Sequence, residues 1–174
     1  MGARPLQVHK LGGTSVGDAD RIAAAADLLR SVSERARLVV VSSAMAGVTD
    51  ELLRASESAA KSDAALARDI IEKLRERHLA TLSALDPATR DGREREELLA
   101  LLGEVDALLA STAILGELPA RTRDRVVVTG EKLAVRLLAV ALRARSVDAR
   151  ALDADTFLET DGRFGEASAM PIVG

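Results

Sequence analysis

A lysine and two adjacent glycines stand near the start of the chain, in the stretch Lys10-Leu11-Gly12-Gly13-Thr14-Ser15-Val16. The apolar run at residues 6–9 predicts a buried first strand, and residues 17–20 predict the start of a helix. Glycines let a backbone approach a ligand and adopt positive φ, the following helix directs N–H groups at an anion, and the lysine adds positive charge. The stretch therefore suits phosphate binding, although its spacing matches neither common glycine-rich phosphate motif. A plain tight turn between strand and helix fits the same residues.

A second loop of small residues follows the apolar run at residues 37–42. This β-branched run predicts a central parallel strand with both faces buried, joined to the first strand by a right-handed crossover through a helix. The loop leads to a helix that begins at about Thr49, so two strands end in loops that precede helices, which is where open α/β sheets bind ligands. Ser43 and Thr49 could contact a ligand there, or either could cap the following helix.

The remaining elements predict an α/β protein with a mostly parallel sheet and flanking helices. Alanine- and leucine-rich segments with helical spacing predict helices over residues 20–29, 64–85, 94–112 and 133–145. The second and third of these form an αα-hairpin within a helical insertion of about residues 52–118. Residues 120–125 are expected to be helical, and residues 126–128 fit a short strand or a buried helical turn. We expect a strand at residues 147–152, a loop at 160–165 and the start of another strand at 171–174.

Composition narrows the class of protein and its partners. The 174 residues are 48% hydrophobic and 29% charged with a net charge of −3, which fits one globular domain and argues against a nucleic-acid partner. No cysteine is present, and His9 and His78 are far apart in sequence, so we expect no metal site. No stretch reaches 18 uninterrupted apolar residues, so we expect no membrane partner and a cytoplasmic location. We expect His78 to be structural, at the surface or the edge of the core.

Four motifs in this order resemble those of the aspartokinases, within the amino-acid kinase family. Residues 10–16 are similar to the opening K-F-G-G-T-S-V, with Leu11 in place of phenylalanine, and residues 38–49 resemble V-V-x-S-A-x-x-G-[VI]-T. Thr129-Gly130-Glu131 resembles the G-E motif, and residues 160–165 resemble the loop T-D-x-R-F-G. The resemblance implies an α/β/α sandwich, of which residues 1–174 would be the N-terminal portion of the catalytic domain.

The resemblance also implies a reaction, the ATP-dependent phosphorylation of the L-aspartate side chain to 4-phospho-L-aspartate. This is the first step of lysine, threonine and methionine biosynthesis, and ATP would enter as its Mg²⁺ complex. Lys10 would be catalytic and would bind phosphate together with Leu11, Gly12, Gly13 and Ser43. The substrate would contact Thr49, Glu131 through its α-ammonium group, Arg163 and Phe164. Apart from the resemblance, Glu131 also fits a first-turn residue favoured by the helix dipole.

The resemblance leaves the subtype and two other functions open. The His9-Lys10 pair and the long helical middle look most like the bifunctional aspartokinase–homoserine dehydrogenases. Because the family has further motifs after the one at residues 160–165, we expect an incomplete catalytic domain that does not turn over alone, and a homo-oligomer for the intact enzyme. The first alternative is another family member, acting on glutamate, acetylglutamate, carbamate or UMP. The second is a non-catalytic partial domain that acts as an assembly module through an open sheet edge.

Overall fold

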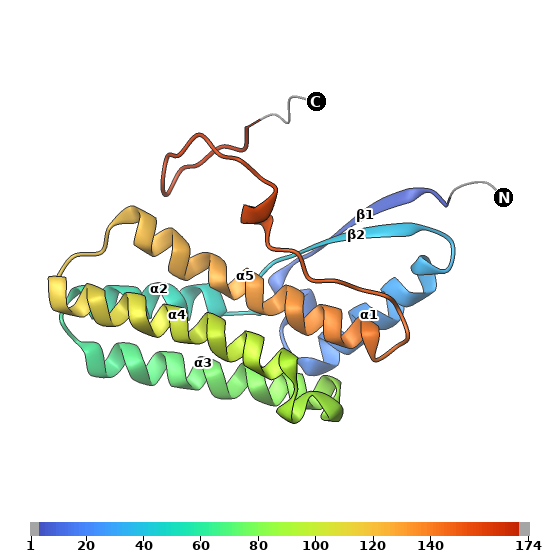
Figure 1. Ribbon diagram of the computed structural model, residues 1–174, viewed down its shortest axis with the longest axis horizontal. Coiled ribbons are helices and arrows are strands. Elements are labelled where there is room, and N and C mark those ends of the chain that lie inside the picture. The colour runs from blue at the N-terminus through green and yellow to red at the C-terminus, as the bar shows by residue number, and fades with distance from the viewer. Residues whose placement is uncertain (1–3, 171–174) are drawn as a thin grey trace.

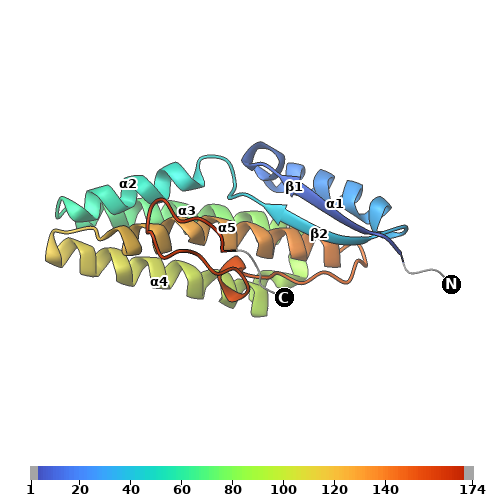
Figure 2. The same ribbon diagram turned by 90° about the horizontal axis from the view of Figure 1, so that it is seen from above.

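The computed structural model describes residues 4–170 and confirms the α/β class (Figure 1). Two strands and five helices follow one another as β1 (Leu6–Leu11), α1 (Ala19–Ser33), β2 (Arg37–Ser42), α2 (Val48–Ala60), α3 (Ala64–Leu85), α4 (Arg93–Leu115) and α5 (Ala120–Arg143). Short 3₁₀ turns lie at Gly13–Val16, Pro87–Asp91 and Ala154–Thr156. The helices form an elongated bundle, and the strands lie beside α1 at one end of it (Figures 1 and 2).

The two strands form a parallel sheet in which Val8 pairs with Val39 and Lys10 with Val41. One face of this sheet packs against the core through Leu11 and the partly buried side chains of β2. The opposite face is open, because Val8 is 67% exposed and Val39 is 47% exposed. The parallel pairing confirms the sequence prediction. The predicted burial of β1, and of β2 on both faces, is wrong for the described residues, which place helices on one face only.

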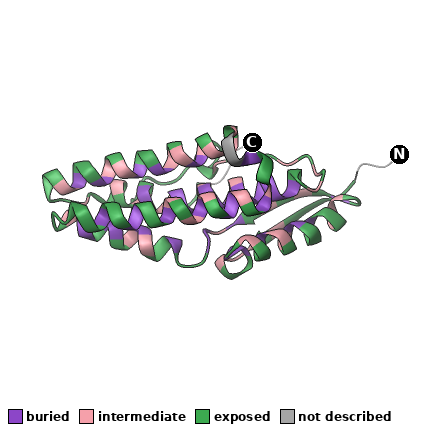
Figure 3. Ribbon diagram, turned by 90° about the horizontal axis from the view of Figure 1, so that it is seen from below, coloured by how far each residue is buried: buried purple, intermediate pink, exposed green. Residues whose placement is uncertain are grey.

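The helices pack through the apolar stripes that their spacing predicts (Figure 3). Helix α2 contacts α3, α4 and α5, while α1 contacts α3 and α5, so α5 connects the sheet end to the rest of the bundle. The largest fully buried side chains are Ile22, Leu29, Met45, Leu52, Ile70, Ile71, His78, Leu82, Leu98, Leu102, Leu133 and Leu137. Helices α3 and α4 form the predicted hairpin, and α3 has the bounds predicted for it.

His78 is fully buried, so its predicted place at the surface or core edge is wrong. It follows Leu74 and precedes Leu82 by four residues each, which puts the imidazole on the apolar stripe of α3. Its Nδ1 lies 2.6 Å from the carbonyl oxygen of Leu74, and its Nε2 has no hydrogen-bond partner among the described residues. Burial lowers the pKa of His78, since the charged imidazolium loses its hydration.

Helix α5 decides between the short strand and the helical turn that the sequence allowed for residues 126–128. The segment at 126–128 is helical and lies within a continuous helix of 24 residues, so the short strand is excluded there. The strand predicted at residues 147–152 is wrong for the described chain, which has no regular secondary structure there. Its backbone is held to the end of α5 instead, since Val147 N–H donates to Leu142 and Arg143 donates to the Ala149 carbonyl. The strand predicted at 171–174 lies outside the described residues.

Helix α4 is, by length and composition, apolar enough to cross a membrane. Core helices of water-soluble bundles meet the same criterion, and α4 packs on α2, α3 and α5 through Leu98, Leu102 and Val105. This property alone therefore does not distinguish a membrane span from a bundle helix.

Candidate active site

The ends of the two strands bring the first two motifs into contact. Ser43 N–H donates to the carbonyl oxygen of Leu11 over 3.0 Å, which extends the parallel pairing by one residue. Next to this bond, a β-carbon built on Gly13 would stand 3.1 Å from the backbone oxygen of Ala44. The residue at position 13 must therefore be small, because the second loop passes directly over it.

The two glycines of the first loop matter because they have no side chain, and not because they adopt unusual backbone angles. Gly12 has φ −83° and ψ 167°, and neither Gly12 nor Gly13 is among the described residues with positive φ. The expectation of positive φ is therefore wrong. A β-carbon on Gly12 would meet no atom within 4 Å, so the backbone there borders open space into which a ligand could fit.

Two arginines hold this loop from outside. Arg21 of α1 donates to the carbonyl of Thr14 over 2.9 Å, and Arg77 of α3 donates to the carbonyl of Gly17 over 2.8 Å. The N-terminus of α1 is capped by Asp18, whose carboxylate accepts from Arg21 N–H. The Asp18 carboxylate thus already binds one of the N–H groups of α1 that the sequence predicts to point at an anion.

The start of α2 is uncapped. Its N-cap is Gly47 at φ 78°, and no side chain accepts a hydrogen bond from its first turn. Ser43 and Thr49 therefore do not cap this helix, which was the alternative to a ligand contact. Within residues 4–170, neither hydroxyl forms a side-chain hydrogen bond, and the Lys10 ammonium has no carboxylate within 4.0 Å. These three polar groups remain available for a ligand.

The third motif reaches the same place from α5. A β-carbon on Gly130 would lie 3.0 Å from the Ala44 Cβ and 3.1 Å from the Val48 Cγ1, so α5 passes close over the start of α2. Glu131 follows at the middle of the helix, and the alternative first-turn position is therefore excluded. The side chain of Glu131 reaches solvent, yet the protein around it removes enough water to raise the pKa of its carboxyl.

The fourth motif is a loop, as predicted, and lies against the first turns of α5. Gly165 N–H donates to Asp124 Oδ2 over 2.6 Å, and the Arg121 guanidinium lies 5.7 Å from the centre of the Phe164 ring. Arg163 forms its ion pair with Asp161, at 3.8 Å. Among the described residues, Arg163 and Phe164 form no polar contact with Glu131 or Thr49. The contacts that connect this loop to the other motifs are those with α5.

Sequence reasoning missed Asp124 and Arg121, because neither belongs to a motif. The seven-residue spacing of Asp124 and Glu131 could have paired them on one helix face, had residues 120–143 been predicted as one helix.

A group of ion pairs fixes the segment between α5 and this loop. Arg136 binds Asp153 through both guanidinium nitrogens, at 2.7 and 3.1 Å, and Lys132 binds Asp155 at 2.6 Å. The Arg136 hydrogen bonds lower the pKa of Asp153 and stabilise its charged form. The segment therefore returns along α5 towards its N-terminus.

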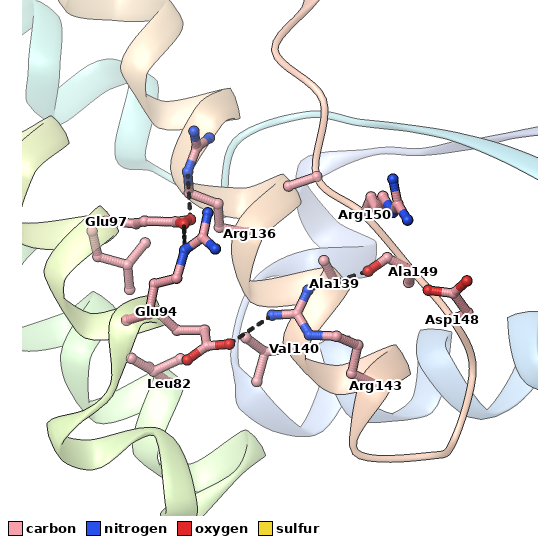
Figure 4. A pocket seen from close by; sticks show the side chains of 13 residues that line it. Leu82, Glu94, Glu97, Arg136, Ala139, Val140, Arg143, Asp148, Ala149 and Arg150 are labelled. Carbon is pink, nitrogen blue, oxygen red and sulfur yellow. Dashed lines mark hydrogen bonds and ion pairs between the residues drawn. The ribbon is translucent and has the colours of Figure 1, made fainter.

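A cavity of about 550 Å³ lies between α4, the end of α5 and residues 148–151 (Figure 4). Two of the arginines that line it already face carboxylates: Arg143 lies 3.1 Å from Glu94, and Arg136 lies 3.6 Å from Glu97. None of the predicted site residues lines this cavity, which argues against its being the active site. Residues 4–170 also contain no cluster of three or more metal-ligating side chains.

The chain matches the model of the Amino acid kinase family over residues 5–171 and therefore belongs to this family. Similar proteins include chloroplastic aspartokinase 1 of Arabidopsis thaliana, 36% identical over 160 residues that cover 88% of this chain and 26% of the relative. Lysine-sensitive aspartokinase 3 of Escherichia coli is 34% identical over 162 residues, covering 93% of this chain and 34% of that protein. The chain thus spans about a third or less of the relatives it matches.

Solved structures give the same result for the fold. E. coli aspartokinase III in complex with lysine and aspartate matches with a TM-score of 0.83 and 30% identity, over 97% of this chain and 35% of that chain. Its complex with aspartate and ADP matches with a TM-score of 0.82, over 95% of this chain and 35% of that chain. These matches confirm the predicted family and fold class.

Proposed function

We propose that this protein takes part in the ATP-dependent phosphorylation of the L-aspartate side-chain carboxylate, as an aspartate kinase. The observation that carries the proposal is the meeting of three motifs at Ala44, which lies between Gly13 of the first loop and Gly130 of α5. The similar proteins are aspartokinases, and one similar structure is a complex with aspartate and ADP.

The phosphate end of the site is assigned to the first two loops. Lys10 supplies positive charge to the transferring phosphoryl group, and Leu11, Gly12 and Gly13 bring backbone close to it. Ser43 is joined to Leu11 by a backbone hydrogen bond, which puts its free hydroxyl beside the same loop. Phosphoryl transfer depends mainly on positioning and charge neutralisation, so these groups suit the reaction without a protein nucleophile.

The amino-acid end is assigned to α2, α5 and the fourth motif. Glu131 would bind the α-ammonium group of aspartate through a charge-assisted hydrogen bond, and Thr49 would contact the same substrate. Arg163 and Phe164 would form its wall. The substrate carboxylate attacks the γ-phosphorus of ATP, the bond to the β–γ bridging oxygen breaks, and ADP leaves. Magnesium is a part of the ATP substrate in this proposal.

Residue-resolved NMR titration of the ¹⁵N-labelled chain tests the assignment. L-Aspartate is expected to shift the amide signals of Thr49 and Glu131, and MgATP those of Gly12, Gly13 and Ser43. L-Glutamate, N-acetylglutamate and UMP are the comparison ligands, because they represent other members of the family. A response to one of these in place of L-aspartate, or no response near Glu131, would contradict the proposal.

Variants assign the response to individual side chains. Glu131→Gln keeps the size of the side chain and removes its charge, so it is expected to weaken aspartate binding about tenfold or more while leaving MgATP binding unchanged. Lys10→Met is expected to weaken MgATP binding while leaving aspartate binding unchanged. Equal effects of both variants on both ligands would contradict the division of the site into two ends.

A second candidate function is an assembly module, and the open sheet face favours it. Leu6, Val8, Val39 and Val41 are each about half exposed or more on that face, and exposed apolar patches mark contact surfaces. Light scattering of the purified chain distinguishes the two functions, since a monomer that binds aspartate would exclude a purely structural role. A cytoplasmic location, a homo-oligomeric intact enzyme and lack of membrane association remain parts of the proposal.

A further inference from the structure

The loop of the fourth motif is held to α5 by Asp124. This half-buried carboxylate accepts a hydrogen bond of 2.6 Å from Gly165 N–H. Gly165 has φ 85°, a backbone angle that favours glycine, so the loop turns sharply at the residue that Asp124 holds. A charged acceptor makes such a hydrogen bond shorter and stronger than a bond between neutral groups.

A second contact acts on the neighbouring loop residue from one helical turn away. The Arg121 guanidinium lies 5.7 Å from the centre of the Phe164 ring, within the range of a cation–π interaction. Residues 164 and 165 are thus each held by a residue of α5, and Arg121 and Asp124 are three positions apart on that helix.

The other polar contacts of this loop are with its own residues and with the residues that directly follow it, up to Ala169. Asp161 accepts from the N–H groups of Arg163 and Ser168, both at 3.2 Å, and forms an ion pair with the Arg163 side chain. These bonds give the loop its shape. They do not fix its place relative to the helices, which leaves that task to Asp124 and Arg121 among the described polar contacts.

Because Asp124 and Glu131 belong to the same helix, a loop held at Asp124 also has a fixed position relative to Glu131. Asp124 and Glu131 are seven residues apart, so their side chains lie on one face of α5, about 10 Å apart along the helix axis. A loop fixed at Asp124 therefore stands at a constant distance from the Glu131 carboxyl, because a continuous helix joins the two.

We propose that Asp124 is a positioning residue for the amino-acid substrate, which holds Arg163 and Phe164 beside the face of α5 that carries Glu131. The proposal rests on the proposed function for the identity of the substrate, L-aspartate. The anchoring of the loop rests on the Asp124–Gly165 and Arg121–Phe164 contacts alone.

Three variants of the full chain test this role. Asp124→Ala removes the acceptor, Asp124→Asn keeps an oxygen acceptor without the charge, and Arg123→Ala alters the adjacent exposed residue as a matched control. The first measurement is the amide NMR signal of Gly165 and its neighbours, and the second is calorimetric titration with L-aspartate and with MgATP.

Asp124→Ala is expected to shift the Gly165 amide signal and to leave the signals of α2, α3 and α4 unchanged. It is expected to weaken L-aspartate binding about tenfold with no change in MgATP binding, as suits the loss of one charged hydrogen bond. Asp124→Asn should restore most of the aspartate affinity, and Arg123→Ala should match the unaltered chain.

The two proposals fail in different ways. An unmoved Gly165 amide in Asp124→Ala, or equal weakening of both ligands, overturns the positioning role and leaves the proposed function intact. If the unaltered chain binds MgATP but not L-aspartate, the proposed function is overturned, and with it the substrate named for Asp124.

Discussion

A β-carbon built on Gly130 would lie 3.0 Å from the Cβ of Ala44, closer than most β-carbon contacts in folded proteins. On the other side of Ala44, the backbone oxygen would lie 3.1 Å from a β-carbon on Gly13. Ala44 therefore separates the first loop from α5 by the width of one small residue. Three segments that are distant in sequence lie this close together because the two glycines and this alanine are small.

Gly130→Ala is expected to lower the free energy of unfolding by about 1–3 kcal/mol, the usual cost of overpacking a close contact. The added methyl would press on Ala44, Val48 and Leu52, at 3.0, 3.1 and 3.3 Å. Urea unfolding followed by circular dichroism measures the change.

The matched control is Gly103→Ala in α4, where a β-carbon would meet no atom within 4 Å. Alanine is a better helix former than glycine, so the free energy of unfolding of this variant is expected to rise by about 0.5–1 kcal/mol. Equal effects of the two substitutions would contradict the close approach of α5 to Ala44.

Gly12 and Gly13 are expected to respond differently to alanine. Gly13→Ala should lower the free energy of unfolding by about 1 kcal/mol or more, because its methyl meets the Ala44 backbone oxygen. Gly12→Ala should leave stability within about 0.5 kcal/mol and still weaken MgATP binding, since its methyl would fill the open space beside the loop. Calorimetry and urea unfolding of both variants check this, and unchanged MgATP binding by Gly12→Ala would count against a phosphate site.

Strong local patterns predicted most of the elements. Helix α3 and strand β2 have the bounds that the sequence indicates, since one repeats apolar residues at helical spacing and the other is a β-branched run. The four motifs also predicted which segments belong together, and the structure brings the first three close to one another at Ala44.

The sequence predictions that were wrong concern residues whose structure or burial depends on packing between elements that are distant in sequence. The valines at 126–128 fit two structures locally, and in the folded chain they lie within α5, which packs on α1, α2, α3 and α4. The burial of His78 and the exposure of Val8 depend on which elements cover them, which periodicity does not specify. Asp124 lies outside every motif, so its contact with Gly165, 41 residues later, could not be predicted from local sequence.

The free energy of unfolding is expected to fall below about pH 6.5 because of His78. Burial and the nearby Arg77 charge lower the folded-state pKa of His78 beneath its unfolded value of 6.5. Between these two values the unfolded state binds a proton that the folded state does not, so stability is complete above pH 6.5 and declines as pH falls. One such group contributes a slope of at most about 1.4 kcal/mol per pH unit.

Urea unfolding of the chain and of His78→Leu between pH 7.5 and about pH 5 isolates this contribution, since the variant cannot titrate at position 78. The difference in free energy between the two proteins should change with pH in the stated direction. A constant difference would show that His78 does not titrate differently in the folded and unfolded states.

Asp153→Ala is expected to lower the free energy of unfolding by about 1–3 kcal/mol, because it leaves the partly buried Arg136 without its two hydrogen bonds to that carboxylate. The control is Asp69→Ala, which breaks the exposed pair with Lys73 and should cost at most about 0.5 kcal/mol. Thermal unfolding of both variants measures the contrast, and similar losses would mean that the Arg136–Asp153 pair contributes no more than a surface pair.

The most direct measurement is the titration of the Glu131 carboxyl by ¹³C NMR, with and without saturating L-aspartate. In the free protein its pKa should lie above the ordinary glutamate value, because the surrounding protein removes water from the carboxylate. Bound aspartate should lower this pKa, since its α-ammonium group favours the charged carboxylate. A Glu131 pKa that does not change, or that rises, when aspartate binds would contradict the assignment of Glu131 to the substrate.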